Sequence, residues 1–256
     1  MGYNNENAGL SPIIVDIETC GLPNASDFLE PVFAAKNLKD PEKIKADIEA
    51  RTAERNDKLA LDWNVGRIAA LGWWTEEQDT CAVMCPSEES EIIALQVFWR
   101  ESQHRSIVGF NIKGFDLRFL IQRSRYLGVL HPQLDLGKYS RKGITDLFLE
   151  LTFSDGTYDQ GAMRRTLHAF CKRFGIPVSD TISGKDVPAL VAAGKWEQVE
   201  AHVRSDVALT VALARRLGIV REDSREPGDP DGEAFRGDEA AAFNRSEQAA
   251  ALELKR

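Results

Sequence analysis

The stretch Ile13-Ile14-Val15-Asp16-Ile17-Glu18-Thr19 decides the fold class of this 256-residue chain. Its near-continuous apolar character is typical of a central strand that is buried on both faces. Two acids interrupt the run, and because side chains alternate along a strand, Asp16 and Glu18 project from the same face. Buried carboxylates are costly without a compensating charge, so the pair indicates a cation site. An Asp-x-Glu pair also arises by chance, and that alternative stays open for the pair taken alone.

Further strands and helices are expected later in the chain. Strands are predicted at residues 66–74, 79–85 and 106–111, and a fifth near 144–146. Helical patterns follow residue 87 and residue 114, and they dominate residues 164–217, with a clear break at Gly175-Ile176-Pro177. Three consecutive strands, then alternating helix and strand, then a helical region predict an α/β fold with a mixed five-stranded sheet flanked by helices.

Two later segments place polar residues in buried contexts. Asn111 and Asp116 follow the strand expected at 106–111, and Asp116 begins a helix, where the helix dipole favours a carboxylate. His202 and Asp206 are four residues apart in a helical pattern, so they lie on one face, which is otherwise apolar. Each has a structural alternative, because Asp116 can cap its helix, Asn111 can form a turn, and a lone core histidine is more often structural.

The three segments together are more specific than any one of them. Four carboxylates, Asp16, Glu18, Asp116 and Asp206, offer hard oxygen ligands, which suit Mg²⁺ or Mn²⁺ better than zinc. Two such ions about 4 Å apart can activate a water molecule and stabilise the leaving oxygen of an in-line phosphoryl displacement. The set therefore predicts phosphodiester hydrolysis.

In their order and spacing, these motifs resemble the DEDD superfamily of 3′→5′ exonucleases, which has a ribonuclease H-like fold. The resemblance covers about residues 11–217. The stretch Gly109-Phe110-Asn111-Ile112-Lys113-Gly114-Phe115-Asp116 is similar to the proofreading domains of family B DNA polymerases and their stand-alone relatives. The resemblance implies two Mg²⁺ or Mn²⁺ ions held by the four carboxylates, with Glu18 also placed to orient the nucleophilic water.

One position departs from the superfamily pattern. One branch has Tyr four residues before the last Asp and the other has His five residues before it, whereas His202 lies four residues before Asp206. The residues around it look like the Tyr branch with the Tyr replaced. A neutral imidazole can accept or relay the proton of the attacking water. The alternative is that His202 only fills space in a weakened enzyme.

Other residues are candidates for substrate contacts. Asn111 is expected to contact the scissile nucleotide, and Phe115 to wedge against the terminal base, since an aromatic face stacks on any base. Packing of Phe115 in the core is the structural alternative. Lys185 is a candidate for a phosphate contact, with a solvated loop position as its alternative. Asp146, at the end of the fifth expected strand, is a candidate support for the site.

These features predict a 3′→5′ exonuclease that acts on single-stranded DNA 3′ ends and releases nucleoside 5′-monophosphates. Proofreading, DNA replication and DNA repair are the expected settings, with a DNA polymerase acting in trans. Two alternatives stay open. One is an RNA 3′→5′ exonuclease of the same fold, and the other is a non-catalytic nucleic-acid-binding or polymerase-scaffolding domain.

Bulk properties limit the class of protein. A net charge of −8 argues against a protein that coats duplex DNA with a basic surface. No apolar run reaches about 18 residues and no signal peptide is apparent, so we expect a cytoplasmic protein with no membrane span. Its four cysteines are expected to be reduced. The expected organisation is a flexible N-terminus at 1–10, an exonuclease domain at 11–220 with a charged, helical surface insert at about 36–61, and an acidic, disordered tail at 221–256.

Overall fold

The sheet has the mixed, five-stranded organisation predicted from the sequence. The structure is a computed structural model that describes residues 11–137, 140, 142–153 and 166–220, so the predictions for residues 1–10 and 221–256 lie outside it. The strand order is β3-β2-β1-β4-β5, with β1 antiparallel to β2, β2 antiparallel to β3, and β1, β4 and β5 parallel. The strands are β1 (Ile13–Gly21), β2 (Gly66–Trp74), β3 (Cys81–Met84), β4 (Ile107–Gly109) and β5 (Ile144–Asp146).

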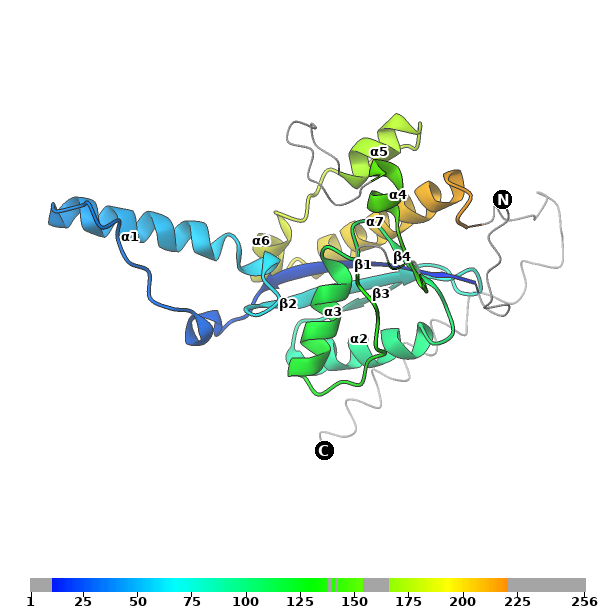
Figure 1. The fold of residues 1–256 in the computed structure, drawn as a ribbon, viewed down its shortest axis with the longest axis horizontal. Helices are drawn as coiled ribbons and strands as arrows, with labels where there is room; N and C mark the ends of the chain where they lie inside the picture. The colour runs from blue at the N-terminus through cyan, green and yellow to red at the C-terminus, as the bar shows by residue number, and fades with distance from the viewer. Residues whose placement is uncertain (1–10, 138–139, 141, 154–165, 221–256) are drawn as a thin grey trace. The chain divides into compact units, whose positions relative to one another are not determined.

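Helices cover both faces of this sheet (Figure 1). On one face lie α2 (Glu88–Glu101) and α3 (Asp116–Tyr126), and on the other lie α4 (Leu147–Thr152), α5 (Leu167–Arg173), α6 (Val187–Ala192) and α7 (Trp196–Arg216). Within the described ranges, no helix is long and apolar enough to cross a membrane.

The structure differs from the sequence prediction in two places. The fourth strand ends at Gly109 because Asn111 adopts a left-handed backbone conformation, with φ of 60°. A short helix, α4, was not predicted; its first turn begins where the Asp146 side chain accepts a hydrogen bond from the Phe148 N–H. The break expected at Gly175-Ile176-Pro177 is present and covers residues 174–186, where Gly175 has a positive φ of 73°.

The side chains of β1 alternate between the two layers. Ile13, Val15 and Ile17 pack into the core formed with α2 and α3. Ile14 packs into the core formed with α4, α5 and α7. Because the period of a strand is two residues, Asp16 and Glu18 follow Ile14 and face the layer that contains α7.

A close approach of α7 to the sheet depends on Gly72. This residue of β2 pairs with Asp16 across the β1–β2 ladder. A Cβ atom at Gly72 would lie 2.9 Å from Val203 Cγ2 and 3.0 Å from Val207 Cγ2, which is closer than carbon atoms normally approach. The missing side chain therefore lets α7 lie directly over the strand next to the acidic pair.

We predict that Gly72→Ala lowers the free energy of unfolding by about 1–3 kcal/mol, because β-branched valine side chains have little freedom to move away. Denaturant unfolding measures the change. A Gly72→Ala/Val203→Ala double variant is the matched control, since it reopens the space. Its loss should be smaller than the sum of the two single losses. Additive losses, or an unchanged Gly72→Ala protein, would contradict the packing described here.

The charged insert contains one helix, α1 (Pro41–Asn56), which points away from the sheet in Figure 1. Asp40 caps it, with Oδ1 accepting from the Glu42 N–H at 3.0 Å, and Pro41 takes the first helical position. None of its residues is buried. The helix is thus a surface element whose sequence contributes little to the core.

Candidate active site

β1 presents the first two acids of the site. Glu18 is 5% exposed and Asp16 is half-buried, both on the face covered by α7. A register shift between Glu18 and Thr19 marks a bulge directly after the pair. Bulges re-aim side chains and occur often beside active sites, so this irregularity is a local reason for the orientation of Glu18.

Asp116 joins the acidic pair from the start of α3. The residue is buried, and its Oδ1 accepts a hydrogen bond from the backbone N–H of Ile17 at 3.2 Å. Ile17 lies between Asp16 and Glu18, so this bond ties the third acid to the strand that carries the other two. The N-cap position of α3 is occupied by Phe115, without a side-chain capping bond.

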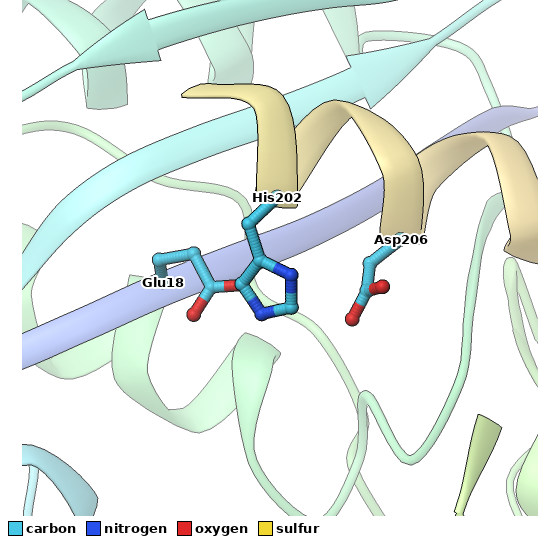
Figure 2. Close-up of side chains that lie close together, drawn as sticks. All are labelled: Glu18, His202 and Asp206. Atoms are coloured by element: carbon cyan, nitrogen blue, oxygen red, sulfur yellow. The ribbon is translucent and has the colours of Figure 1, made fainter. Parts of the chain in front are cut away.

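α7 contributes the last acid together with a histidine. His202 and Asp206 lie one turn apart and point toward Glu18 (Figure 2). His202 is 2% exposed, and its Nε2 lies 3.2 Å from Glu18 Oε1. One possible ligand atom from each of these three residues lies within 4.8 Å of the other two. The arrangement follows from helix geometry, because residues four apart share a face.

Crowding shifts the acid–base behaviour of the carboxylates. Burial raises the pKa of Asp16 well above its usual value, and the charges of Asp116, Glu18 and Asp206 raise it further. Burial and the charges of Asp206 and Asp116 do the same for the pKa of Glu18. The pKa of Asp116 is raised to about 7, again chiefly by burial. The structure therefore brings together all four carboxylates that the sequence singled out.

Such a set fits divalent cations. Ionised carboxylates in a water-poor site repel one another, and a cation removes that penalty by holding them in the charged form. The donors are oxygen atoms of Asp and Glu, the ligands that Mg²⁺ and Mn²⁺ take up in proteins. Asp16, Glu18, Asp116 and Asp206 are the residues that would hold these ions, and the number of ions stays a prediction.

Two residues at the site were not found by sequence reasoning, Asp180 and His168. Asp180 Oδ2 lies 2.6 Å from His202 Nδ1, and His168 Nε2 lies 3.2 Å from Asp206 Oδ1. Asp180 lies in the non-helical stretch before α6, and His168 lies in the first turn of α5, so neither has a recognisable motif spacing. The available signal was the scarcity of histidine, since two of the four in the chain lie here.

The predicted substrate contacts have structural partners of their own. Asn111 is exposed, and its carbonyl accepts hydrogen bonds from the backbone N–H groups of Gly114 and Phe115, each at 3.0 Å. It therefore makes the turn that was its alternative reading. Phe115 is half-buried, and its ring lies 5.3 Å from that of Phe119 in the core. Roles for Asn111 and Phe115 in substrate binding stay predictions.

Asp146 organises the loop that leads to Asp116. Its Oδ1 accepts hydrogen bonds from the N–H groups of Asn111 at 2.9 Å and Phe148 at 3.0 Å, and its Oδ2 accepts from the Lys113 N–H at 3.0 Å. The carboxylate thus joins the end of β5 to the loop after β4. Its position agrees with the supporting role considered from the sequence.

We predict that Asp146→Ala lowers the free energy of unfolding by about 2–3 kcal/mol, because it leaves backbone donors without an acceptor in a largely buried place. The isosteric Asp146→Asn variant keeps one acceptor oxygen and should lose less. Denaturant unfolding of the three proteins tests the order. Equal stability of wild type and Asp146→Ala would show that the loop does not depend on this carboxylate.

The profile of one protein family matches residues 64–225, and that family is described as predicted 3′-5′ exonucleases related to the exonuclease domain of PolB. The chain belongs to this family. The matched range of this exonuclease-family chain includes Asp116, His202 and Asp206, whereas Asp16 and Glu18 precede it. The fold places Asp16 and Glu18 beside the residues of the matched range, since Asp116 accepts a hydrogen bond from the Ile17 N–H and His202 lies 3.2 Å from Glu18.

A solved structure shows the same fold. The exonuclease-family chain is similar to the family B DNA polymerase from the hyperthermophilic archaeon Pyrobaculum calidifontis, with a TM-score of 0.53 and 20% sequence identity. The similarity covers 82% of this chain and 24% of the polymerase chain, so this chain spans about a quarter of the polymerase it matches. The comparison confirms the ribonuclease H-like α/β fold. Comparison with curated protein sequences gives no match.

Proposed function

We propose that this chain is a metal-dependent 3′→5′ exonuclease that hydrolyses single-stranded DNA to nucleoside 5′-monophosphates with two Mg²⁺ or Mn²⁺ ions. The observation that carries the proposal is the convergence of four carboxylates from β1, α3 and α7, close enough that their charges raise the pKa values of Asp16, Glu18 and Asp116. Membership of the exonuclease family supports the same reaction class.

The bound ions would supply activation of the water and stabilisation of the departing 3′-oxygen. The side chains of the protein position the attacking water and the nucleic acid. Glu18 orients the attacking water, and His202 lies beside it, with 3.2 Å between His202 Nε2 and Glu18 Oε1. Asn111 contacts the scissile nucleotide, Phe115 stacks on the terminal base, and Lys185 contacts a backbone phosphate. Lys185 is exposed and follows Gly184, whose Cβ position lies 3.8 Å from Glu18 Oε2, so this loop borders the site.

The alternatives have weaker support. An RNA exonuclease would use the same four carboxylates, and the choice of DNA rests on the relation to polymerase exonuclease domains. A non-catalytic binding or polymerase-scaffolding domain is favoured only by the histidine at the Tyr position. Retention of all four acids favours an enzyme, since unpaired buried carboxylates destabilise a protein that makes no use of them.

The decisive experiment compares three substrates at equal concentration: a single-stranded DNA oligonucleotide, an RNA of matched sequence, and the DNA in a blunt duplex. With Mg²⁺ or Mn²⁺ we expect nucleoside 5′-monophosphates from the single-stranded DNA at the highest rate. Faster release from the RNA would select the RNA exonuclease. Measurable binding of both single strands without product would select the non-catalytic domain.

Proofreading and repair require a partner under this proposal. The partner would be a cytoplasmic DNA polymerase acting in trans, whose mismatched primer ends the exonuclease would trim. Affinity purification of the tagged full-length protein tests this assignment, and recovery without any polymerase would count against it.

The helix of the insert, α1, has no buried residue and is the segment we assign to partner or substrate contact. Removing residues 36–61 with no effect on rate, affinity or processivity would dispose of that assignment.

A further inference from the structure

The histidine of α7 has contacts that differ from those of a residue that merely fills space. His202 is 2% exposed, yet both ring nitrogens face carboxylates. Nε2 lies 3.2 Å from Glu18 Oε1, and Nδ1 lies 2.6 Å from Asp180 Oδ2. A phenol at this position would present one oxygen, whereas an imidazole presents a nitrogen lone pair that can bind a metal ion.

The spacing around Nε2 matches a coordination shell. In an octahedral site with bonds of about 2.1 Å, adjacent ligand atoms lie about 3 Å apart and opposite ones about 4.2 Å apart. The 3.2 Å separation from Glu18 Oε1 corresponds to an adjacent pair. Asp206 completes a set of three ligand atoms that all lie within 4.8 Å of one another. Such a group of three side chains could hold one metal ion.

Asp180 supplies the outer partner that a metal-binding histidine requires. Asp180 Oδ2 lies 2.6 Å from His202 Nδ1, which is a hydrogen-bond distance, and Asp180 holds that side of the ring in place. When Nδ1 donates its proton to Asp180, the lone pair is left on Nε2, the nitrogen that lies 3.2 Å from Glu18 Oε1. Metal-bound histidines commonly donate their second nitrogen to a carboxylate in this way, which fixes the tautomer and the ring plane.

We propose that His202 Nε2 is a ligand, together with Glu18 and Asp206, of one of the two divalent cations, and that this position selects Mn²⁺ over Mg²⁺. The assignment rests on the proposed function for the presence of two cations. Its chemical basis is that imidazole suits transition-metal ions, whereas Mg²⁺ prefers carboxylate and water oxygen. Asp180 is then a positioning residue that acts through His202.

The test detects the metal–nitrogen bond without substrate. The full-length protein is freed of metal with EDTA, loaded with Mn²⁺, and studied by electron-spin-echo spectroscopy for coupling to a directly bound nitrogen. Wild type is expected to show the coupling. His168→Gln, which removes the other imidazole of the site, should retain it, and His202→Tyr should lose it. Bound Mn²⁺ without nitrogen coupling in wild type would overturn the assignment, even if the variants fail to fold.

Affinity gives a second readout. Calorimetric titration of the metal-free proteins should show Mn²⁺ binding weakened about 10- to 100-fold by Asp180→Asn, as for other outer partners of metal ligands, and at least as much by His202→Tyr. Mg²⁺ binding should change much less. Equal effects on both ions would contradict the selectivity. Because no nucleic acid is present, a protein with the Mn²⁺–nitrogen bond but no nuclease activity would refute the proposed function alone, and a Mn²⁺-dependent nuclease without that bond would refute the ligand alone.

Discussion

Asp206→Asn is expected to lower the rate of nucleotide release from single-stranded DNA by at least about a thousandfold. Asp206 is the acid that α7 brings to Glu18 and His202, within 4.8 Å at their ligand atoms. A bound cation contributes several kcal/mol of transition-state stabilisation, and each 1.4 kcal/mol corresponds to about a tenfold change in rate. Single-turnover rates with saturating Mg²⁺ or Mn²⁺ measure the loss. Asp16→Asn should lower the rate of nucleotide release by a similar factor.

The matched control for this prediction lies on the same helix. Glu200→Gln also removes one negative charge from α7, but Glu200 pairs with Arg204 at 2.8 Å and is well exposed. Its rate should stay close to wild type. Folding is a second control, because removing one of the mutually repelling acids should leave the metal-free Asp206→Asn protein at least as stable as wild type. Near-wild-type rates for both Asp206→Asn and Asp16→Asn would contradict the proposed site.

The metal-free protein is expected to lose stability as the pH rises from about 4 to about 7. Asp116 has a pKa raised from 3.8 to about 7, and the pKa values of Asp16 and Glu18 are raised well above 3.8 and 4.5. Between about pH 4 and about pH 7 the folded state binds more protons than the unfolded state, so the free energy of unfolding falls with increasing pH. The stabilisation is complete below about pH 4 and is lost as the pH passes through the folded pKa values.

The expected size of this loss is several kcal/mol, since each unit of pKa difference corresponds to about 1.4 kcal/mol. Denaturant unfolding from pH 4 to pH 8 in EDTA measures it. Saturating Mn²⁺ or Mg²⁺ should remove most of the loss, because the cations bind the ionised folded state. Asp116→Asn should flatten the metal-free profile. A metal-free stability that rises between pH 4 and pH 7 would contradict the account. The acids that face Asp116 in this site are Asp16, Glu18, Asp146 and Asp206.

Much of the fold could be predicted because its signals are local. The apolar run around Asp16 specifies a buried strand, and the two-residue period places Glu18 on the same face. The four-residue spacing of His202 and Asp206 likewise specifies one side of a helix. The resemblance to exonucleases then predicted that the acidic face of the strand meets the His202–Asp206 face of the helix. In the structure, ligand atoms of Glu18, His202 and Asp206 lie within 4.8 Å of one another.

The remaining features depend on contacts between distant segments. Asp180 reaches His202 across 22 residues, and His168 reaches Asp206 across 38 residues. Neither pair has a periodicity, so no local pattern could identify it. The short β4 depends on left-handed backbone at Asn111, which propensity alone does not place. The bulge after Glu18 is similarly a property of the β1–β2 pair and not of β1 alone.

One measurement tests the central claim most directly: the first product released from single-stranded DNA labelled in its 3′-terminal nucleotide. The metal-free protein is mixed with this DNA in EDTA, and excess Mn²⁺ is then added. The proposed exonuclease predicts no product before the addition and, after it, a labelled nucleoside 5′-monophosphate as the first product. A longer labelled fragment would indicate an endonuclease. Intact DNA that is nevertheless bound by the protein, with the same result for matched RNA, would contradict catalysis at the four carboxylates.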